Sequence, residues 1–201
     1  MPLFPAFGLC IKAAMNEGPE TLPHPLWVFG YGSLIWNPGF PVAEQALATL
    51  SGFTRSFCMS SIHHRGTVED PGLVLALDPH ENGHCQGVGF RVPDTDVESI
   101  VSDLRERELI SSAYIEMVLP ITLDTGATVN ALAYVVDTDH VQYVGGLPLE
   151  RQAEIIAYAV GGRGPNTEYL WNTVVHLHEL GIADAELDWL SGRVREMTQK
   201  T

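Results

Sequence analysis

The sequence W-V-F-G-Y-G-S-L-I-W, residues 27–36, begins as a buried strand and then breaks into a loop that contains two glycines. Gly30 and Gly32 are separated by one residue, which is unusual inside a strand because each glycine weakens it. Glycine is kept where the backbone needs positive φ or must approach another group closely. The stretch therefore predicts a strand that runs into a tight loop. That loop is either a simple turn or one whose successive N–H groups converge on an anion or a carbonyl oxygen.

Two known glycine motifs do not fit this loop. The third glycine of a dinucleotide-binding fingerprint would fall at position 35, which is isoleucine, and no Walker lysine lies nearby. Ser33 does not fit the nucleophile position of a G-x-S-x-G motif, because Tyr31 and Ile35 occupy both glycine positions. The loop thus predicts neither a nucleotide-binding motif of these types nor an activated serine.

The elements around this stretch are predicted from hydrophobic pattern and turn residues. Strands are indicated by runs of Val, Leu, Ile and aromatic residues between Gly, Pro or Asp, at residues 26–29, 54–60, 73–77, 86–92, 114–123 and 128–136. Helices are indicated at residues 94–111, 149–160, 167–180 and 184–198. Strands come first, with one helix among them, and helices come last, an order that predicts an α+β fold.

Length and charge narrow the class of protein. The 201 residues suit one domain, which we expect over residues 26–201, preceded by an N-terminal extension at residues 1–25. The chain has 25 Asp and Glu against 11 Lys and Arg, a formal net charge of −14. Nucleic acids and anionic membrane surfaces repel such a chain, so we expect neither as a partner.

Cysteine usage and the N-terminal sequence predict a cytoplasmic protein. The three cysteines at positions 10, 58 and 85 form no C-x-x-C motif, which suggests a reducing compartment. No run approaches the ~18 apolar residues of a membrane span. The apolar N-terminus lacks the basic start of a signal peptide.

One carboxylate stands out on the helix predicted at residues 94–111. Its apolar stripe is formed by Val97, Ile100, Val101 and Leu104. Glu108 continues that stripe, whereas Glu106 faces roughly the opposite side of the helix. A buried carboxylate has a raised pKa unless it is paired, and such groups mark catalytic sites. If the helix ends before position 108, Glu108 is instead solvated, and periodicity does not decide between the two.

No metal or other cofactor is predicted. Possible ligands occur in three groups without the spacing of a metal site: His63 with His64, His80 with His84 and Cys85, and His176 with His178. Further along, Asn166 and Glu168 suit the beginning of a helix, so capping explains both without a function. Arg163, in the loop before that helix, could face a substrate carboxylate.

Five short motifs, taken in order, resemble the ChaC-like γ-glutamylcyclotransferases over residue 26 to the last helix. They are F-G-Y-G-S-L-I-W at 29–36, H-R-G at 64–66, L-x-x-R-E at 104–108 with Tyr114 six residues later, Y-V-G-G-L-P-L-E at 143–150, and G-P-N-T-E-Y-L at 164–170. The resemblance implies a mixed, barrel-like sheet of about six strands with flanking helices and a helical C-terminal part.

The resemblance also implies an activity and a site. The family cleaves glutathione to 5-oxoproline and cysteinylglycine without a cofactor. Its catalytic acid/base falls on Glu108, and its substrate-binding residues fall on Phe29, Gly30, Tyr31, Gly32, Ser33, Leu34 and Tyr114. The family often has glycines before this tyrosine, whereas this chain has Ser112 and Ala113. Two alternatives stay open: a non-catalytic binding protein on the same fold, and a cyclotransferase for other γ-glutamyl peptides or amines.

Overall fold

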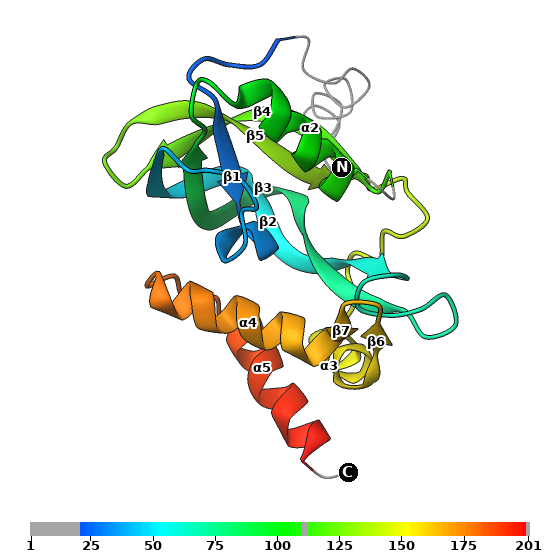
Figure 1. Ribbon diagram of the computed structural model, residues 1–201. Coiled ribbons are helices and arrows are strands. Elements are labelled where there is room, and N and C mark those ends of the chain that lie inside the picture. The colour runs from blue at the N-terminus through cyan, green and yellow to red at the C-terminus, as the bar shows by residue number, and fades with distance from the viewer. Residues whose placement is uncertain (1–20, 110–111, 200–201) are drawn as a thin grey trace, which may run out of the picture. The chain divides into compact units, whose positions relative to one another are not determined.

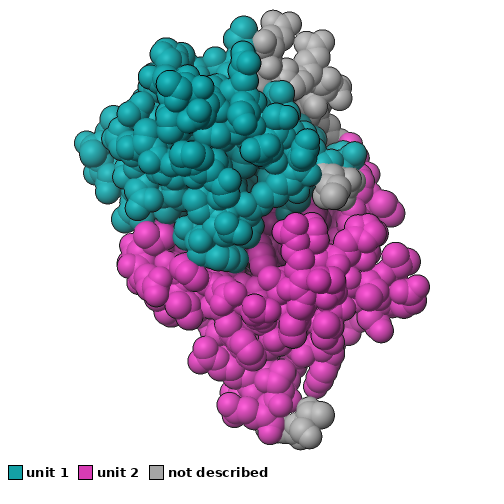
Figure 2. Space-filling model, viewed as in Figure 1, with its two compact units in different colours: residues 1–55, 77–137 teal, residues 56–76, 138–201 magenta. Residues whose placement is uncertain are grey.

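The computed structural model describes residues 21–109 and 112–199. They group into two compact units, shown in teal and magenta in Figure 2. The first unit takes its residues from 1–55 and 77–137, and the second from 56–76 and 138–201. Most of the predicted N-terminal extension, residues 1–20, lies outside the described residues. A single domain over residues 26–201 stays a prediction.

The first unit is built on a closed five-stranded barrel in the order β1-β3-β2-β4-β5 (Figure 1). Its strands are β1 Trp27–Gly30, β2 Glu44–Ser61, β3 Gly72–Arg91, β4 Tyr114–Leu123 and β5 Thr128–Val136. β1 pairs antiparallel with β3 and parallel with β5, so the sheet is mixed. β4 and β5 have the bounds expected from the sequence, and they pair antiparallel over all of β5 and all but the last residue of β4.

The barrel has five strands where about six were expected, because residues 73–77 and 86–92 belong to a single 20-residue strand, β3. The intervening residues 80–85, H-E-N-G-H-C, are expected to form a turn between two strands. In the structure they continue the strand. A Cβ on Gly83 would lie 2.8 Å from the backbone carbonyl carbon of Phe53. The glycine at this position therefore permits close approach of a neighbouring strand instead of a turn.

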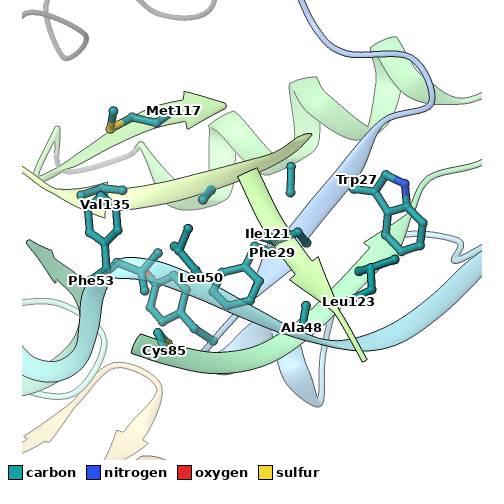
Figure 3. Close-up of a cluster of buried hydrophobic side chains, with 14 residues drawn as sticks. Trp27, Phe29, Ala48, Leu50, Phe53, Cys85, Met117, Ile121, Leu123 and Val135 are labelled. Atoms are coloured by element: carbon teal, nitrogen blue, oxygen red, sulfur yellow. The ribbon is translucent and has the colours of Figure 1, made fainter. Parts of the chain in front are cut away.

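The barrel interior is filled by alternate residues of its strands. Trp27 and Phe29 of β1 belong to this interior cluster, and Figure 3 shows Trp27 and Leu123 beside each other within it. Leu26 and Val28 point the other way, into a second buried cluster. Because successive side chains of a strand face opposite sides, β1 serves both clusters.

The second cluster packs helix α2, Val97–Glu108, against the outside of the barrel. Ile100, Val101 and Leu104 are the buried residues of the helix, and they meet Leu132 and Tyr134 of β5. This is the apolar stripe expected from the sequence, although the helix is three residues shorter at each end than the predicted 94–111. The stripe fixes the rotation of α2 and thereby the direction of its last residue, Glu108.

The second unit carries the C-terminal helices α3 Leu149–Tyr158, α4 Asn166–Glu179 and α5 Ala185–Thr198. A two-stranded ribbon of β6 Val160–Gly161 and β7 Gly164–Pro165 joins α3 to α4 (Figure 1). None of the helices in the described ranges has the length and apolar character needed to cross a membrane. The predicted α+β class, with helices at the C-terminal end, is confirmed.

Candidate active site

The glycine loop follows β1 and forms a short 3-10 helix, η1 Ser33–Ile35. Its first hydrogen bond runs from the N–H of Ile35 to the carbonyl oxygen of Gly32, at 2.9 Å. The N–H groups of Gly32, Ser33 and Leu34 lie before the first hydrogen bond of this helix, so they have no acceptor within the turn itself. The loop is thus a turn, as one of the two predicted alternatives has it, and the binding of an oxygen atom by its N–H groups stays a prediction.

A buried arginine fixes the first peptide of this loop. The Nε of Arg55 donates to the carbonyl oxygen of Tyr31 at 2.6 Å, and its guanidinium also donates to the carbonyl oxygen of Gln86. In a trans peptide the C=O and the next N–H point in opposite directions. Because Arg55 holds the Tyr31 carbonyl, the N–H of Gly32 points away from Arg55.

Two of the predicted substrate-binding residues have side chains in the barrel interior. Phe29 is fully buried, and Tyr31 is 6% exposed with its hydroxyl donating to the carbonyl oxygen of Tyr134 at 2.9 Å. Gly30 has no room for a side chain, since a Cβ there would lie 2.7 Å from the Phe90 ring. The backbone of this loop, more than its side chains, is therefore the part suited to bind a ligand.

Glu108 is the last residue of α2, and the helix does not end before it. Its side chain is 17% exposed, while Glu106 is exposed to solvent. The Glu108 carboxylate forms an ion pair with the Nε of Arg107, at 3.1 Å. Of the two glutamates in R-E-R-E, only Glu108 is thus partly withdrawn from solvent.

The same arginine reaches the glycine loop. Arg107 donates to the Ser33 hydroxyl oxygen at 2.9 Å and to the carbonyl oxygens of Asn37 and Pro38 at 2.7 and 3.3 Å. Two predicted site elements, the loop at 29–34 and Glu108, are therefore joined through one side chain. Spacing in the sequence gave no signal for this link.

A buried carboxylate beside α2, that of Glu116, was missed by sequence reasoning. Glu116 of β4 is 7% exposed and receives two hydrogen bonds from Nε and one from Nη2 of Arg105, the last at 2.7 Å. Tyr134, its cross-strand neighbour, donates its hydroxyl to Glu116 at 3.1 Å. Burial raises the pKa of the Tyr134 phenol first of all, and the charges of Glu116 and Glu108 raise that pKa further. A glutamate within an apolar strand was the available signal.

Tyr114 begins β4, opposite Val136, and its side chain is half-buried at the edge of the cluster under α2. Two residues earlier, Ser112 has a φ of 54°, in the left-handed region that favours glycine. This is one of the positions where the family often has glycine. Ser112 therefore has the backbone conformation that favours glycine, although the residue itself is serine.

The other motifs lie in the second unit, where H-R-G meets G-P-N-T-E-Y-L. Arg65 donates to the carbonyl oxygen of Pro165 at 3.1 Å, pairs with Glu168 at 3.4 Å and stacks over the ring of Tyr169 at 5.6 Å. A Cβ on Gly66 would lie 2.0 Å from the backbone nitrogen of Gly72. These motifs are explained by tight packing between segments.

Asn166 is not the N-cap that its sequence position suggests. It is the first residue of α4, is fully buried, and its amide accepts from the N–H of Leu73 at 2.6 Å and donates to the carbonyl oxygen of Leu73 at 2.8 Å. Pro165 holds the N-cap position instead. Asn166 therefore joins α4 to β3, which local sequence rules do not foresee.

The histidine groups do not assemble a metal site in the described residues. No group of three or more His, Cys, Asp or Glu residues suited to hold a metal ion occurs in residues 21–109 and 112–199. His63 and His64 instead use their carbonyl oxygens, which accept from the N–H groups of Gly162 and Arg163. The side chain of Arg163, a candidate for a substrate carboxylate, is exposed.

Comparison with known proteins gives the family. The glutathione-specific γ-glutamylcyclotransferase of Escherichia coli (strain K12) is 37% identical over 173 residues, which cover 86% of this chain and 74% of that protein. The enzyme of the same description from Schizosaccharomyces pombe is 33% identical over 195 residues, covering 88% and 95%.

A solved structure shares the fold. A yeast γ-glutamyl cyclotransferase specific to glutathione superposes with a TM-score of 0.80 at 23% identity, covering 88% of this chain and 98% of that chain. This likeness confirms the γ-glutamylcyclotransferase-like fold. The model of the family described as "ChaC-like protein" matches residues 26–197, and this chain therefore belongs to the ChaC-like family.

Proposed function

We propose that this chain is a γ-glutamylcyclotransferase that converts glutathione to 5-oxoproline and cysteinylglycine. The observation that carries the proposal is the joining of Glu108 and the 32–34 turn through Arg107, in a chain that is 37% identical to a protein named for this activity. A carboxylate that acts on the substrate amine and N–H donors that act on its carbonyl oxygen are the two groups that the reaction needs.

The reaction is an internal transfer within the glutamyl residue. The α-amine attacks the γ-carbonyl carbon, a C–N bond closes the five-membered ring, and the C–N bond to the cysteine residue breaks. Because nucleophile and electrophile are already tethered, the protein has mainly to hold the chain in an attack geometry. No enzyme nucleophile is required, which agrees with the absence of a nucleophile motif around Ser33.

Glu108 is assigned the proton transfers. The substrate amine is largely protonated near neutral pH, since α-amino groups have a pKa of about 8. Glu108 accepts a proton from this ammonium and later supplies one to the departing amine. The guanidinium of Arg107, 3.1 Å away, favours the charged form of the Glu108 carboxylate, which is the form that accepts the first proton.

The N–H groups of Gly32, Ser33 and Leu34 are assigned the oxyanion that forms on the γ-carbonyl. Preorganised backbone donors of this kind typically contribute about 3 kcal/mol each to the transition state. The contact of Arg55 with the Tyr31 carbonyl supports this assignment, because it fixes the direction of the Gly32 N–H. Tyr114 is proposed to contact the substrate from the start of β4.

Incubation with glutathione and a panel of γ-glutamyl dipeptides and amines tests the function, with 5-oxoproline measured by mass spectrometry. We expect 5-oxoproline from glutathione, and the same rate after treatment with EDTA. Product from another γ-glutamyl compound at a higher kcat/KM would move the assignment to that substrate. Absence of product from every compound, in folded protein, would favour a binding protein on the same fold.

A further inference from the structure

Arg107 occupies a position between the two groups to which the reaction is assigned. Its Nε lies 3.1 Å from the Glu108 carboxylate, and its two terminal nitrogens reach the Ser33 hydroxyl and the carbonyl oxygens of Asn37 and Pro38. The side chain is 22% exposed. All of its guanidinium nitrogens therefore have a specific acceptor in the first unit.

The segment after η1 is shaped to receive this guanidinium. Gly39 has a φ of +79°, which favours glycine, and a Cβ placed there would lie 3.3 Å from Nη1 of Arg107. The carbonyl oxygens of Asn37 and Pro38 converge on the same nitrogen. A cation attracted only by the C-terminal dipole of α2 would not require such a set of acceptors.

The neighbouring Arg105 offers a comparison within the same helical turn. It is directed to Glu116 on β4, and its side chain is 48% exposed. Among the described residues, its hydrogen bonds go to Glu116 and not to Glu108 or the 33–39 segment. Two arginines in one turn thus tie α2 to two different places, and only Arg107 touches the candidate acid/base.

We propose that Arg107 is a positioning residue that sets the placement of the Glu108 carboxylate relative to the N–H donors of the 32–34 turn, an inference that rests on the proposed function. The base and the oxyanion donors act on two atoms of one small ring, the α-nitrogen and the γ-carbonyl oxygen. Their relative placement therefore decides whether both act on one substrate conformation, and a displacement of about 1 Å can cost about 10²-fold in rate.

The planar, forked shape of the guanidinium distinguishes arginine from lysine at position 107. Arginine presents several N–H donors in a rigid plane, whereas lysine offers a compact charge on a flexible stem. Lysine at position 107 can keep the charge near Glu108 but cannot also hold Ser33 and the two carbonyl oxygens. Arg107→Lys therefore separates the effect of charge from the effect of placement.

The experiment compares Arg107→Met and Arg107→Lys with the matched control Arg105→Met, in the full chain with glutathione. For Arg107→Met we expect kcat to fall by about 10²-fold, with a smaller change in KM. We also expect the acidic limb of the kcat/KM–pH profile to move to higher pH, because a cation 3.1 Å from the carboxylate is lost. Arg107→Lys should keep the wild-type acidic limb but not the wild-type kcat.

Two further readouts separate positioning from folding. Thermal unfolding of each variant reports stability, and added guanidinium ion, below unfolding concentrations, should restore part of the activity of Arg107→Met, whereas urea should not. Arg105→Met should lower stability and leave the acidic limb unchanged. If Arg107→Met does not fold, Arg107→Lys decides: wild-type kcat in that variant overturns the proposal.

The outcomes distinguish this inference from the proposed function. The positioning role alone would be overturned if Arg107→Met had the wild-type kcat and the wild-type acidic limb while Glu108→Gln was inactive. Equal losses of stability and kcat in the Arg105 and Arg107 variants, without a pH shift, would reduce Arg107 to a structural residue. Full activity of Glu108→Gln would remove the proposed function together with the inference.

Discussion

The two units of the chain, shown in Figure 2, contain similar residues in different structural roles. In the second unit, Arg65 and Asn166 satisfy backbone groups of neighbouring segments, and Gly66 lets backbones meet. In the first unit, Arg55 and Arg107 also bind carbonyl oxygens, but the turn that they hold leaves N–H groups without a partner inside it. The side chains of Arg65 and Asn166 thus bind backbone groups of the second unit, whereas the turn of the first unit has N–H groups that its own hydrogen bonding does not use. The difference predicts that changes in the second unit act on stability and changes in the first act on turnover.

The largest expected effect is on the two glutamates at the end of α2. Glu108→Gln keeps volume while removing the proton acceptor, so kcat should fall by about 10²–10⁴-fold with glutathione still bound. Glu106→Gln, the control, should leave kcat unchanged and the free energy of unfolding within about 0.5 kcal/mol. Steady-state kinetics and ligand binding check both. An inactive Glu106→Gln beside an active Glu108→Gln would show that the motif register is wrong.

The next effect is expected on stability, from the buried side-chain amide of Asn166 in the second unit. Asn166→Ala leaves the N–H and C=O of Leu73 buried without this partner, which should cost about 2–4 kcal/mol in the free energy of unfolding. Asn172→Ala, on the half-buried side of the same helix, is the control and should cost less. Denaturant unfolding gives both values. The comparison between units breaks if Asn166→Ala lowers kcat of the folded protein while its stability stays at the wild-type value.

The glycine loop should respond through its backbone. Gly32→Val crowds the position next to the N–H donors and should lower kcat by roughly tenfold or more, since one oxyanion donor is typically worth more than that. Ser33→Ala removes one acceptor of Arg107, a neutral partner worth about 1 kcal/mol, and should cost only a few-fold. Kinetics on variants of verified fold decide the order. Full activity in Gly32→Val would argue against the oxyanion role.

The smallest effect is expected at alkaline pH from the barrel's buried phenol. Because the pKa of Tyr134 is raised above its ordinary value of 10.0, the folded state keeps its proton at a pH where the unfolded state has released it. Stability from this group is therefore complete below pH 10.0 and is lost as pH rises above it, by up to about 1.4 kcal/mol per pH unit.

Tyr134→Phe should show a flatter decline of unfolding free energy above pH 10.0 than the wild type. Tyr158→Phe, which changes an exposed tyrosine of α3, corrects for the general effect of removing a tyrosine. Denaturant titrations at a series of alkaline pH values give the slopes. Identical slopes for wild type and Tyr134→Phe would show that this phenol does not carry the dependence.

Several features followed from the sequence by itself because they depend on neighbours along the chain. The bounds of β4 and β5 came from runs of apolar residues, and the phase of α2 came from helical periodicity. That phase distinguished Glu108 from Glu106, since residues two apart on a helix face different sides. The five motifs gave the family. Local rules were sufficient where the determining contacts lie within a few residues.

Only the tertiary structure decided the contacts between distant segments. Local sequence rules suggest a helix cap at Asn166, yet its side chain binds Leu73, 93 residues away. Arg107 likewise binds Ser33, 74 residues away. The continuity of β3 through Gly83 does not follow from the sequence, because the sequence does not show that the Phe53 backbone lies close to this glycine. Glu116 was missed because its partners, Arg105 and Tyr134, come from other elements. A polar side chain takes its role from the groups that folding brings within about 3 Å of it, and sequence spacing does not contain that distance.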